Sequence, residues 1–463
     1  MQPTPTHDRE QNLVSKSPNI LYVFTDQMRA SAMGCAQSEP VHTPCLDRFA
    51  AQGVRFENAI ANTPVCTPSR ASLITGRHAW TCRNIVNDIR LPEEERSIAD
   101  VLKKQGYRTG YIGKWHLDGW PRDAPIPPGR RRHGFDDYWA AYDCTHDYLH
   151  PRYYLNDDLE PTYAEGYDVD VHTDLAIGFL EQFQDDPFCL FLSWGPPHSP
   201  YDQVPQAFLD QYPLDEIPLR PNVEGVDRAA IAGYYAHITA LDVAFGRMME
   251  ALDRLSLSEN TIVVFSSDHG DMLWAQGRVK KQQPWQESIG IPLIARWPDQ
   301  LPAGEVSDLL VSVVDHAPTV LGLAGVSVPE WMNGLDLSPV LRGESTDEPQ
   351  SAFIAEYVSF GQSSIYQPWR GVRTKRHTYA RWLQGGTLLY DHATDPYELR
   401  NLVHEPGHQA LLEDMENELQ EWLDRLDDPF LPPDACFHTL GRTEEWEARK
   451  TYFPRWARRR NSS

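Results

Sequence analysis

Short apolar segments alternate with helical patterns along the part of the chain that precedes Pro329. The apolar segments predict buried strands at residues 19–24, 108–113, 188–194 and 261–266. Apolar residues at helical spacing predict helices at residues 46–52, 97–105, 174–184 and 227–255. Helices that alternate with buried strands are typical of a parallel sheet covered on both faces. We therefore predict an α/β fold in which a large mixed, mainly parallel sheet lies between helices.

The pattern changes beyond Pro329. Residues 351–382 alternate between polar and apolar positions, which predicts an antiparallel sheet with a turn at Gly385-Gly386. Residues 411–426 have the amphipathic pattern of a helix packed on that sheet. The predicted organisation is an extended N-terminus at 1–18, a main domain at 19–345, a smaller C-terminal α+β subdomain at 346–430 and a solvated tail at 431–463.

Composition narrows the class of protein. The chain has 42 Lys and Arg against 66 Asp and Glu, and its net charge of −24 argues against a nucleic-acid partner. The apolar segments are too short to span a bilayer, so no membrane association is expected. Residues 1–18 show no signal peptide, which predicts a cytoplasmic protein and leaves an exported form open. Seven cysteines, an odd number in a long chain, do not predict a disulfide framework.

Reactive side chains follow four of the predicted strands at the point where each strand ends. They are Asp26, Gln27, Lys114, His116, His198, Asp268 and His269. Ligands of open α/β sheets bind beyond the carboxyl ends of the strands, so we expect these residues to share one site. Lys114 and His116 are two residues apart, so on a strand both would face the same side.

The sharpest local motif is C-T-P-S-R at residues 66–70. Thr67 is predicted to cap a helix in which Pro68 takes the first position and which ends before Gly76. Cys66 would then face the positive end of the helix, where anions bind readily. Arg70 would reach back to the same anion with its two-pronged guanidinium.

Residues 66–77 resemble the signature of type I sulfatases in the alkaline-phosphatase-like superfamily. In that family the cysteine is oxidised after translation to formylglycine, whose hydrate is the nucleophile. Residues 113–117, 197–200 and 267–270 resemble further motifs of the family, and the resemblance extends over most of the chain. It implies an alkaline-phosphatase-like catalytic domain at 19–345, formylglycine derived from Cys66, and a formylglycine-generating enzyme as the maturation partner.

Three positions depart from the commonest family pattern. Gln27 replaces a frequent Asp, His269 replaces a frequent Asn, and Trp285-Gln286 stand where Tyr-Glu is usual. Counting back from Ser288 favours Lys281 over Lys280 as the catalytic lysine.

The resemblance implies a metal site made of Asp26, Gln27, Cys66, Asp268 and His269. Their donors are mostly hard oxygens with one nitrogen, which suits one divalent ion, Ca²⁺ foremost and Mg²⁺ or Mn²⁺ as alternatives. Arg70, Lys114 and Lys281 would leave the pocket net positive, as a bound sulfate oxyanion requires.

The predicted mechanism has two displacements. One hydroxyl of the formylglycine hydrate at position 66 attacks sulfur, while the metal ion, Arg70, Lys114 and Lys281 stabilise the sulfate oxygens. His198 or Lys281 protonates the leaving alcohol oxygen. His116 then accepts the proton of the second hydroxyl, which expels sulfate and restores the aldehyde.

Substrate contacts are expected from loops over the metal. The candidates are Asn87, Asp143, His146 and His150, in segments that resemble bacterial carbohydrate sulfatases of the N-acetylglucosamine-6-sulfatase group. The expected reaction is hydrolysis of a small sulfate ester of a carbohydrate or aryl alcohol. Two alternatives remain at this point: a phosphodiesterase or phosphonate monoester hydrolase with the same nucleophile, and an inactive binding protein with an unmodified thiol at Cys66.

Overall fold

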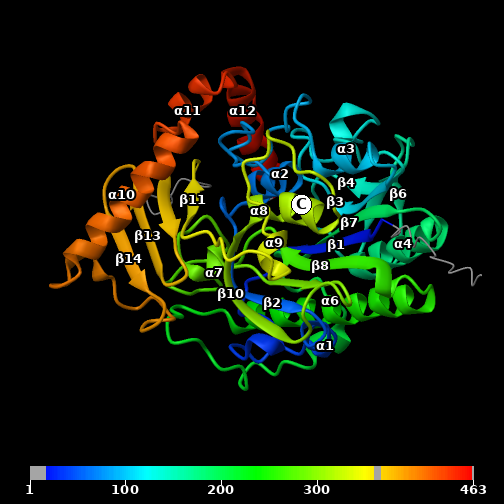
Figure 1. Cartoon of the computed structure of the whole chain (residues 1–463), viewed down its shortest axis with the longest axis horizontal. Helices are drawn as coiled ribbons and strands as arrows, with labels where there is room; N and C mark the ends of the chain where they lie inside the picture. The colour runs from blue at the N-terminus through cyan, green and yellow to red at the C-terminus, as the bar shows by residue number, and fades with distance from the viewer. Residues whose placement is uncertain (1–16, 359–366, 461–463) are drawn as a thin grey trace, which may run out of the picture.

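The computed structural model describes residues 17–358 and 367–460, with residues 453–460 described by their backbone alone. The N-terminal segment predicted at 1–18 therefore lies outside the described residues, apart from Ser17 and Pro18. A ten-stranded sheet forms the centre of the described part, in the order β10-β2-β9-β8-β1-β7-β3-β4-β5-β6 (Figure 1). Its strands are β1 (Asn19–Asp26), β2 (Val54–Ile60), β3 (Arg108–Lys114), β4 (Tyr138–Tyr142), β5 (Arg152–Leu155), β6 (Thr162–Tyr163), β7 (Phe188–Pro197), β8 (Thr261–Ser267), β9 (Leu293–Arg296) and β10 (Glu305–Ser312).

The centre of the sheet is parallel. Strand β1 pairs in parallel with both β7 and β8, and β3 pairs in parallel with β7 and β4. Strand β9 runs antiparallel between β2 and β8, and β5 and β6 form an antiparallel edge. The predicted large mixed, mainly parallel sheet is confirmed.

Helices cover both faces of this sheet (Figure 1). One face carries α1 (Pro44–Ala50), α4 (Asp168–Phe183), α5 (Gln206–Leu209) and α6 (Arg228–Arg254), and the other carries α2 (Cys66–Thr75), α3 (Ile98–Lys103), α8 (Val313–Leu323) and α9 (Ser338–Leu341). Side chains alternate along β1, so that Leu21 and Val23 enter the first core and Ile20, Tyr22 and Phe24 enter the second. None of the described helices is long and apolar enough to cross a membrane.

Helix α4 begins at Asp168 rather than at residue 174. Its first turn carries Asp168 and Asp170, which favour the positive end of a helix. These two residues are polar, so apolar spacing alone could not reveal the start of the helix.

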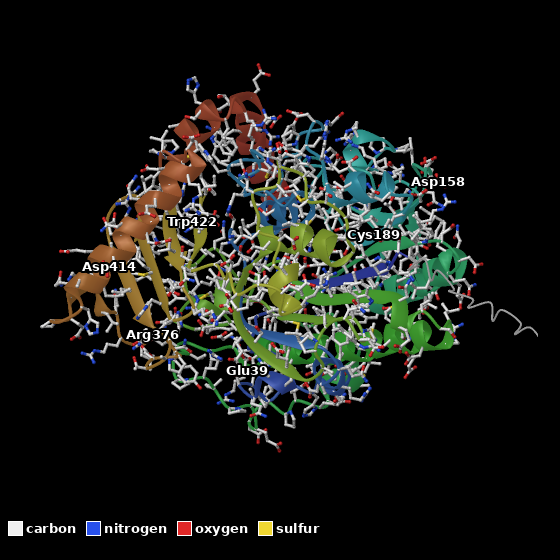
Figure 2. The ribbon with its side chains drawn as sticks, viewed as in Figure 1. Glu39, Asp158, Cys189, Arg376, Asp414 and Trp422 are labelled. Carbon is white, nitrogen blue, oxygen red and sulfur yellow. The ribbon has the colours of Figure 1, made fainter. Side chains whose placement is uncertain are left out.

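A second sheet lies beside the first. Its strands β11 (Ala352–Glu356), β12 (Trp369–Arg373), β13 (His377–Trp382) and β14 (Thr387–Asp391) are antiparallel, and α7 (Gln286–Ile289) precedes it in the chain. Helix α10 (Gln409–Leu426) packs on this sheet, with Trp422 toward the strands and Asp414 toward solvent (Figure 2). Figure 2 also shows Cys189 among the packed side chains of the main sheet. The predicted antiparallel region and its helix are confirmed.

The segment predicted as a solvated tail is folded instead. It contains α11 (Pro433–Thr439) and α12 (Thr443–Arg460), and Phe437 stacks on Trp446 with ring centroids 4.6 Å apart. Both rings are buried. The apolar residues that anchor the segment are few and far apart, which explains why its composition indicated an exposed terminus.

Candidate active site

The site lies where the central parallel strands end. Asp26 is the last residue of β1, and Asp268 and His269 directly follow β8, which is its neighbour in the sheet. Lys114 ends β3, and His198 follows β7, on the opposite side of β1. Because parallel neighbours end at the same edge, residues far apart in the chain come together there.

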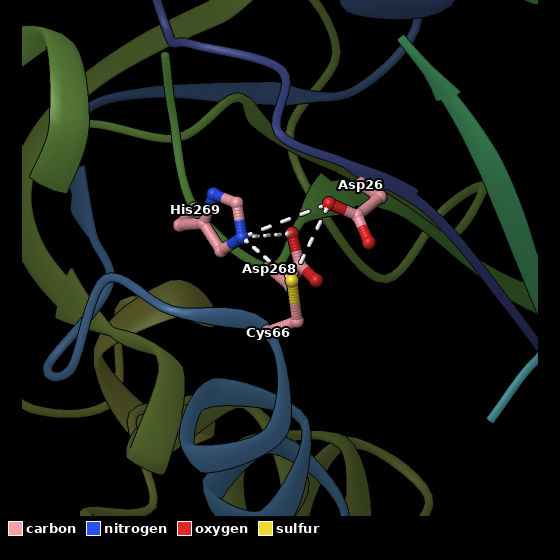
Figure 3. A group of neighbouring side chains, drawn as sticks. All are labelled: Asp26, Cys66, Asp268 and His269. Atoms are coloured by element: carbon pink, nitrogen blue, oxygen red, sulfur yellow. Dashed lines mark hydrogen bonds and ion pairs between the residues drawn. The ribbon is translucent and has the colours of Figure 1, made fainter. Parts of the chain in front are cut away.

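Four side chains form a compact cluster of metal-ligating atoms (Figure 3). One donor atom from each of Asp26, Cys66, Asp268 and His269 lies within 4.8 Å of the others. His269 Nε2 is 3.3 Å from Cys66 Sγ, 3.6 Å from Asp26 Oδ1 and 3.5 Å from Asp268 Oδ1. All four residues are buried, so their charges act in a medium of low polarity.

The protonation of His269 suits a metal ligand. Its Nδ1 donates a hydrogen bond to the backbone oxygen of Gly270 at 3.0 Å. A carbonyl oxygen can only accept, so in the neutral ring the lone pair lies on Nε2, which faces the two carboxylates. Two carboxylates and one imidazole nitrogen fit a hard divalent ion.

Gln27 lies next to this cluster through a backbone turn at φ 76°. Its Oε1 accepts a hydrogen bond from Lys281 Nζ at 2.7 Å, and its Nε2 donates to Asp271 Oδ2 at 2.7 Å. Asp271 was not among the sequence candidates. Its carboxylate binds the amide nitrogen, so that the amide oxygen points toward Lys281.

Two lysines bring positive charge to the cluster. Lys114 Nζ contacts Asp26 Oδ2, and Lys281 Nζ lies 3.3 Å from Cys66 Sγ. Burial raises the pKa of Asp26, but the nearby positive charges, Lys114 foremost, hold it well below its usual range. Burial and Asp26 raise the pKa of the Cys66 thiol, and Lys114 and Lys281 outweigh them and lower it. Lys280 is exposed, so the structure places Lys281 and not Lys280 at the site.

Arg70 is placed differently from the sequence expectation. Its Nε donates to Asp268 Oδ2 at 2.9 Å, and its Nη2 donates to Asp26 Oδ2 at 3.2 Å. Its Nη1 donates to the Lys114 backbone oxygen at 2.7 Å and to Ser193 Oγ at 2.8 Å. Every nitrogen of the guanidinium thus binds the protein, and Arg70 holds the two carboxylates in place.

The cap of α2 also differs from the expectation. Helix α2 begins at Cys66, with Val65 in the capping position, so Thr67 lies inside the first turn. The free N–H of Thr67 is bound by Asn87 Oδ1 at 2.8 Å, and Thr67 Oγ1 donates to the His116 backbone oxygen at 2.8 Å. Cys66 is still at the positive end of the helix. The helix ends before Gly76, as predicted.

Lys114 and His116 do not share one strand. Strand β3 ends at Lys114, and His116 has φ 54°, so the chain turns between them. The buried Trp115 packs in the core on the α2 side of the sheet, while Lys114 and His116 lie at the site. Their convergence therefore comes from this turn and not from strand alternation. Asp88, which follows the substrate candidate Asn87 in the chain, accepts a hydrogen bond at Oδ1 from His116 Nε2 at 3.1 Å.

His198 and His146 stack on each other, with ring centroids 4.2 Å apart and 6° between the ring planes. His198 Nδ1 donates to the backbone oxygen of Ser199 at 2.7 Å. Burial and the charge of Lys281 lower the pKa of His198 well below its usual range. The favoured form of His198 is therefore the neutral ring with its lone pair on Nε2.

The other expected substrate contacts separate into two groups. Asn87 caps α2, and buried Asp143 accepts a hydrogen bond from the Asp118 backbone N–H at 3.0 Å. Burial raises the pKa of Asp143 to about 7. The side chain of His150 is 81% exposed and pairs with Asp147 at 3.1 Å, so it lies on the surface and not among the catalytic residues.

Fold and site together define a hydrolytic α/β enzyme with a cation site beside a buried nucleophile. The chain belongs to the sulfatase family, because a family model described as sulfatase matches residues 18–326. A model of the C-terminal region of N-sulphoglucosamine sulphohydrolase matches residues 276–425. The resemblance inferred from the motifs is confirmed, and the protein is an enzyme of the sulfuric ester hydrolase class. Sulfatases of this family use a metal ion and formylglycine, and the cluster around Cys66 fits both.

Similar proteins carry names of the same class. An ulvan-active sulfatase of Formosa agariphila is 40% identical, with 91% of this chain and 84% of the relative covered. An endo-4-O-sulfatase of Bacteroides thetaiotaomicron is 31% identical, with 90% and 94% covered. The solved structure of a sulfatase from Bacteroides fragilis superimposes with a TM-score of 0.82 at 33% identity and covers 89% of this chain and 97% of its own.

Proposed function

We propose that this sulfatase hydrolyses a sulfate ester of a carbohydrate, with residue 66 as the nucleophile. The observation that carries the proposal is the position of Cys66, buried at the positive end of α2 between Lys281 and the pair Asp26 and His269. The names of the two relatives support a sulfated glycan as the substrate class. A small sulfated sugar fits best, because the net charge of −24 disfavours long polyanions away from the pocket.

The residues of the site fit two further groups, a divalent metal ion and formylglycine. Asp26, Gln27, Asp268 and His269, together with residue 66, would hold one divalent ion, Ca²⁺ foremost. We further propose that a formylglycine-generating enzyme converts Cys66 to formylglycine. Cys66 is 1% exposed in the folded chain, so this conversion precedes folding. When present, the ion and the aldehyde hydrate supply charge for the sulfate oxygens and an activated oxygen nucleophile.

The residues of this chain have distinct tasks in the reaction. Lys114 and Lys281 bring positive charge to the sulfate oxygens, and Arg70 holds the two carboxylates in place. His116 accepts a proton at Nδ1, because its Nε2–H is engaged by Asp88. The favoured neutral form of His198 presents a lone pair at Nε2, so Lys281 protonates the leaving alcohol oxygen.

Kinetics on three substrates test the proposed reaction. We expect kcat/KM for a sulfated monosaccharide to exceed the values for an aryl sulfate and an aryl phosphodiester. A large preference for the phosphodiester would instead identify a phosphodiesterase or phosphonate monoester hydrolase. The mass of the peptide that contains Cys66 should show conversion of the thiol to the aldehyde. An intact thiol in protein produced with the maturation enzyme would favour an inactive binding protein.

A further inference from the structure

The buried carboxylate of Asp88 contacts His116, the histidine that accepts the proton in the proposed reaction. Asp88 Oδ1 lies 3.1 Å from His116 Nε2, and both residues are almost completely buried, at 3% and 2% exposure. We propose that Asp88 is a positioning residue, which fixes the tautomer and the ring orientation of His116 for the step that releases sulfate. This inference rests on the proposed function and assigns a further residue to the same site.

The chemistry of the contact defines which nitrogen can accept a proton. An ionised carboxylate only accepts hydrogen bonds, so His116 must donate to it from Nε2. In the neutral ring the lone pair then lies on Nδ1, and this atom is buried with no hydrogen-bond partner among the described residues. Burial lowers the pKa of His116, but Cys144 foremost, together with Asp88 and Cys66, raises it well above its usual range, so Cys66 lies beside the ring. The arrangement resembles the histidine–aspartate pairs of other hydrolases, in which the carboxylate holds the imidazole tautomer.

Arg122 keeps the carboxylate ionised and prevents it from rotating. Its Nε donates to Asp88 Oδ1 at 2.7 Å, and its Nη2 donates to Oδ2 at 2.8 Å. Such a bidentate pair is both strong and directional. Burial raises the pKa of Asp88, but the charge of Arg122 and the bond from His116 hold that pKa well below its usual range. Asp88 is therefore an acceptor for His116 whenever the protein is folded at neutral pH.

The loop at residues 83–90, which carries Asp88, is hydrogen-bonded to the C-terminal segment. Arg449 of α12 donates from Nε to the Asn87 backbone oxygen at 2.6 Å. Arg442 donates to the backbone oxygens of Arg83 and Arg90, at 2.6 Å each. Both arginines lie beyond residue 425, outside the two family models. The C-terminal segment thus contributes to the site by holding the loop in which Asn87 binds α2 and Asp88 binds His116.

The Asp88→Asn variant tests the proposal, with Asp118→Asn as the matched control. Asp118 is a buried carboxylate in the same region that accepts a bond from Arg131 Nε at 2.7 Å but does not touch His116. We expect kcat of Asp88→Asn to fall by about 10–100-fold, the range typical for loss of a residue that orients a catalytic group. KM should change little, because His116 and Arg122 bind both carboxylate oxygens of Asp88 inside the protein. Asp118→Asn should keep the kcat of the parent protein.

Two further measurements separate positioning from a purely structural effect. If sulfate release becomes the slow step, Asp88→Asn should show a burst of released alcohol before slow turnover, whereas the parent protein should not. In protein labelled with ¹⁵N-histidine, the Nε2–H proton of His116 should resonate at low field because of its bond to a carboxylate. This resonance should move upfield in Asp88→Asn and stay unchanged in Asp118→Asn. The signal is assigned by its loss in His116→Gln.

The outcomes distinguish this inference from the proposed function. Parent-like kcat and an unshifted His116 resonance in folded Asp88→Asn would overturn the inference while sulfatase turnover stands. The resonance does not require turnover and can be recorded on protein with an unmodified Cys66. A parent protein that shows the resonance but does not hydrolyse any sulfate ester would instead refute the proposed function.

Discussion

Arg70 Nε and Asp268 Oδ2 lie 2.9 Å apart, and the same guanidinium reaches Asp26 Oδ2 at 3.2 Å. Arg70 belongs to α2, whereas the two carboxylates lie at the ends of β8 and β1. One side chain thus fixes the helix that carries Cys66 against both strand ends. All three side chains are at most 1% exposed, so this link is little affected by salt.

Arg70→Lys should weaken metal binding. Lysine keeps the charge but cannot bridge two carboxylates, so their orientation would loosen. We expect the affinity for Ca²⁺ to fall by about 10–100-fold, as measured by isothermal titration calorimetry. Arg77→Lys is the control, because Arg77 pairs with Glu95 at a partly exposed position away from the cluster. Equal affinities in the two variants would show that the bridge does not matter.

Cys66→Ala should abolish turnover without unfolding the protein. The change removes the precursor of the nucleophile but deletes only one sulfur atom from a buried site. Cys82→Ala is the matched control, because Cys82 is also buried and free but lies outside the metal cluster. Turnover of a sulfate ester and thermal unfolding should be measured on both. Parent-like turnover in Cys66→Ala would refute the mechanism.

Gly113→Ala should destabilise the protein more than Gly106→Ala. Both glycines have positive φ, at 95° and 86°, so alanine at either position costs about 1–3 kcal/mol of backbone strain. At Gly113 a Cβ would lie 2.0 Å from the Ser193 backbone oxygen, whereas at Gly106 no atom lies within 4 Å among the described residues. This overlap should cost about 1–3 kcal/mol more. Urea unfolding measures the difference, and equal free energies of unfolding would contradict it.

Glu356→Gln should change how stability depends on pH. Burial raises the pKa of Glu356 from 4.5 to about 8 in the folded protein. Between these values the folded chain holds a proton that the unfolded chain has released, so the free energy of unfolding falls as pH rises. Below about pH 4.5 both states are protonated, and above about pH 8 both are ionised. Urea unfolding across this window should show a smaller decline in Glu356→Gln, and an identical decline would contradict the prediction.

Arg449→Met should lower kcat through the loop at residues 83–90. The variant keeps much of the apolar stem of Arg449 but removes the donor to the Asn87 backbone oxygen. We expect kcat to fall while KM changes little, because Asn87 and Asp88 support α2 and His116. Lys450→Met is the control, since Lys450 of the same helix pairs with the acidic side chains Asp434 and Glu447 at the surface. The same kcat in both variants would show that α12 does not support the site.

The sequence alone was sufficient to predict the strand ends and to single out Cys66, which lies in the metal-ligating cluster. Asp26, His198 and Asp268 each follow a contiguous apolar segment, and the motif at Cys66 lies within five consecutive residues. Local periodicity and spacing carry such information, because it depends on neighbours in the chain. The mainly parallel sheet and the antiparallel region were predicted on the same basis.

Contacts between distant segments could only be seen in the folded chain. Asn87 caps the start of α2 although it lies well beyond the end of that helix in the chain. Its side chain binds the backbone N–H of Thr67, which is 20 positions away. Asp88 meets His116 only because β3 turns after Lys114, and Arg449 reaches the same loop from 362 positions away. Each of these contacts joins groups that share no local pattern. Their partners are selected by the packing of α2, β3 and α12 around one edge of the sheet, and packing is a property of the whole chain.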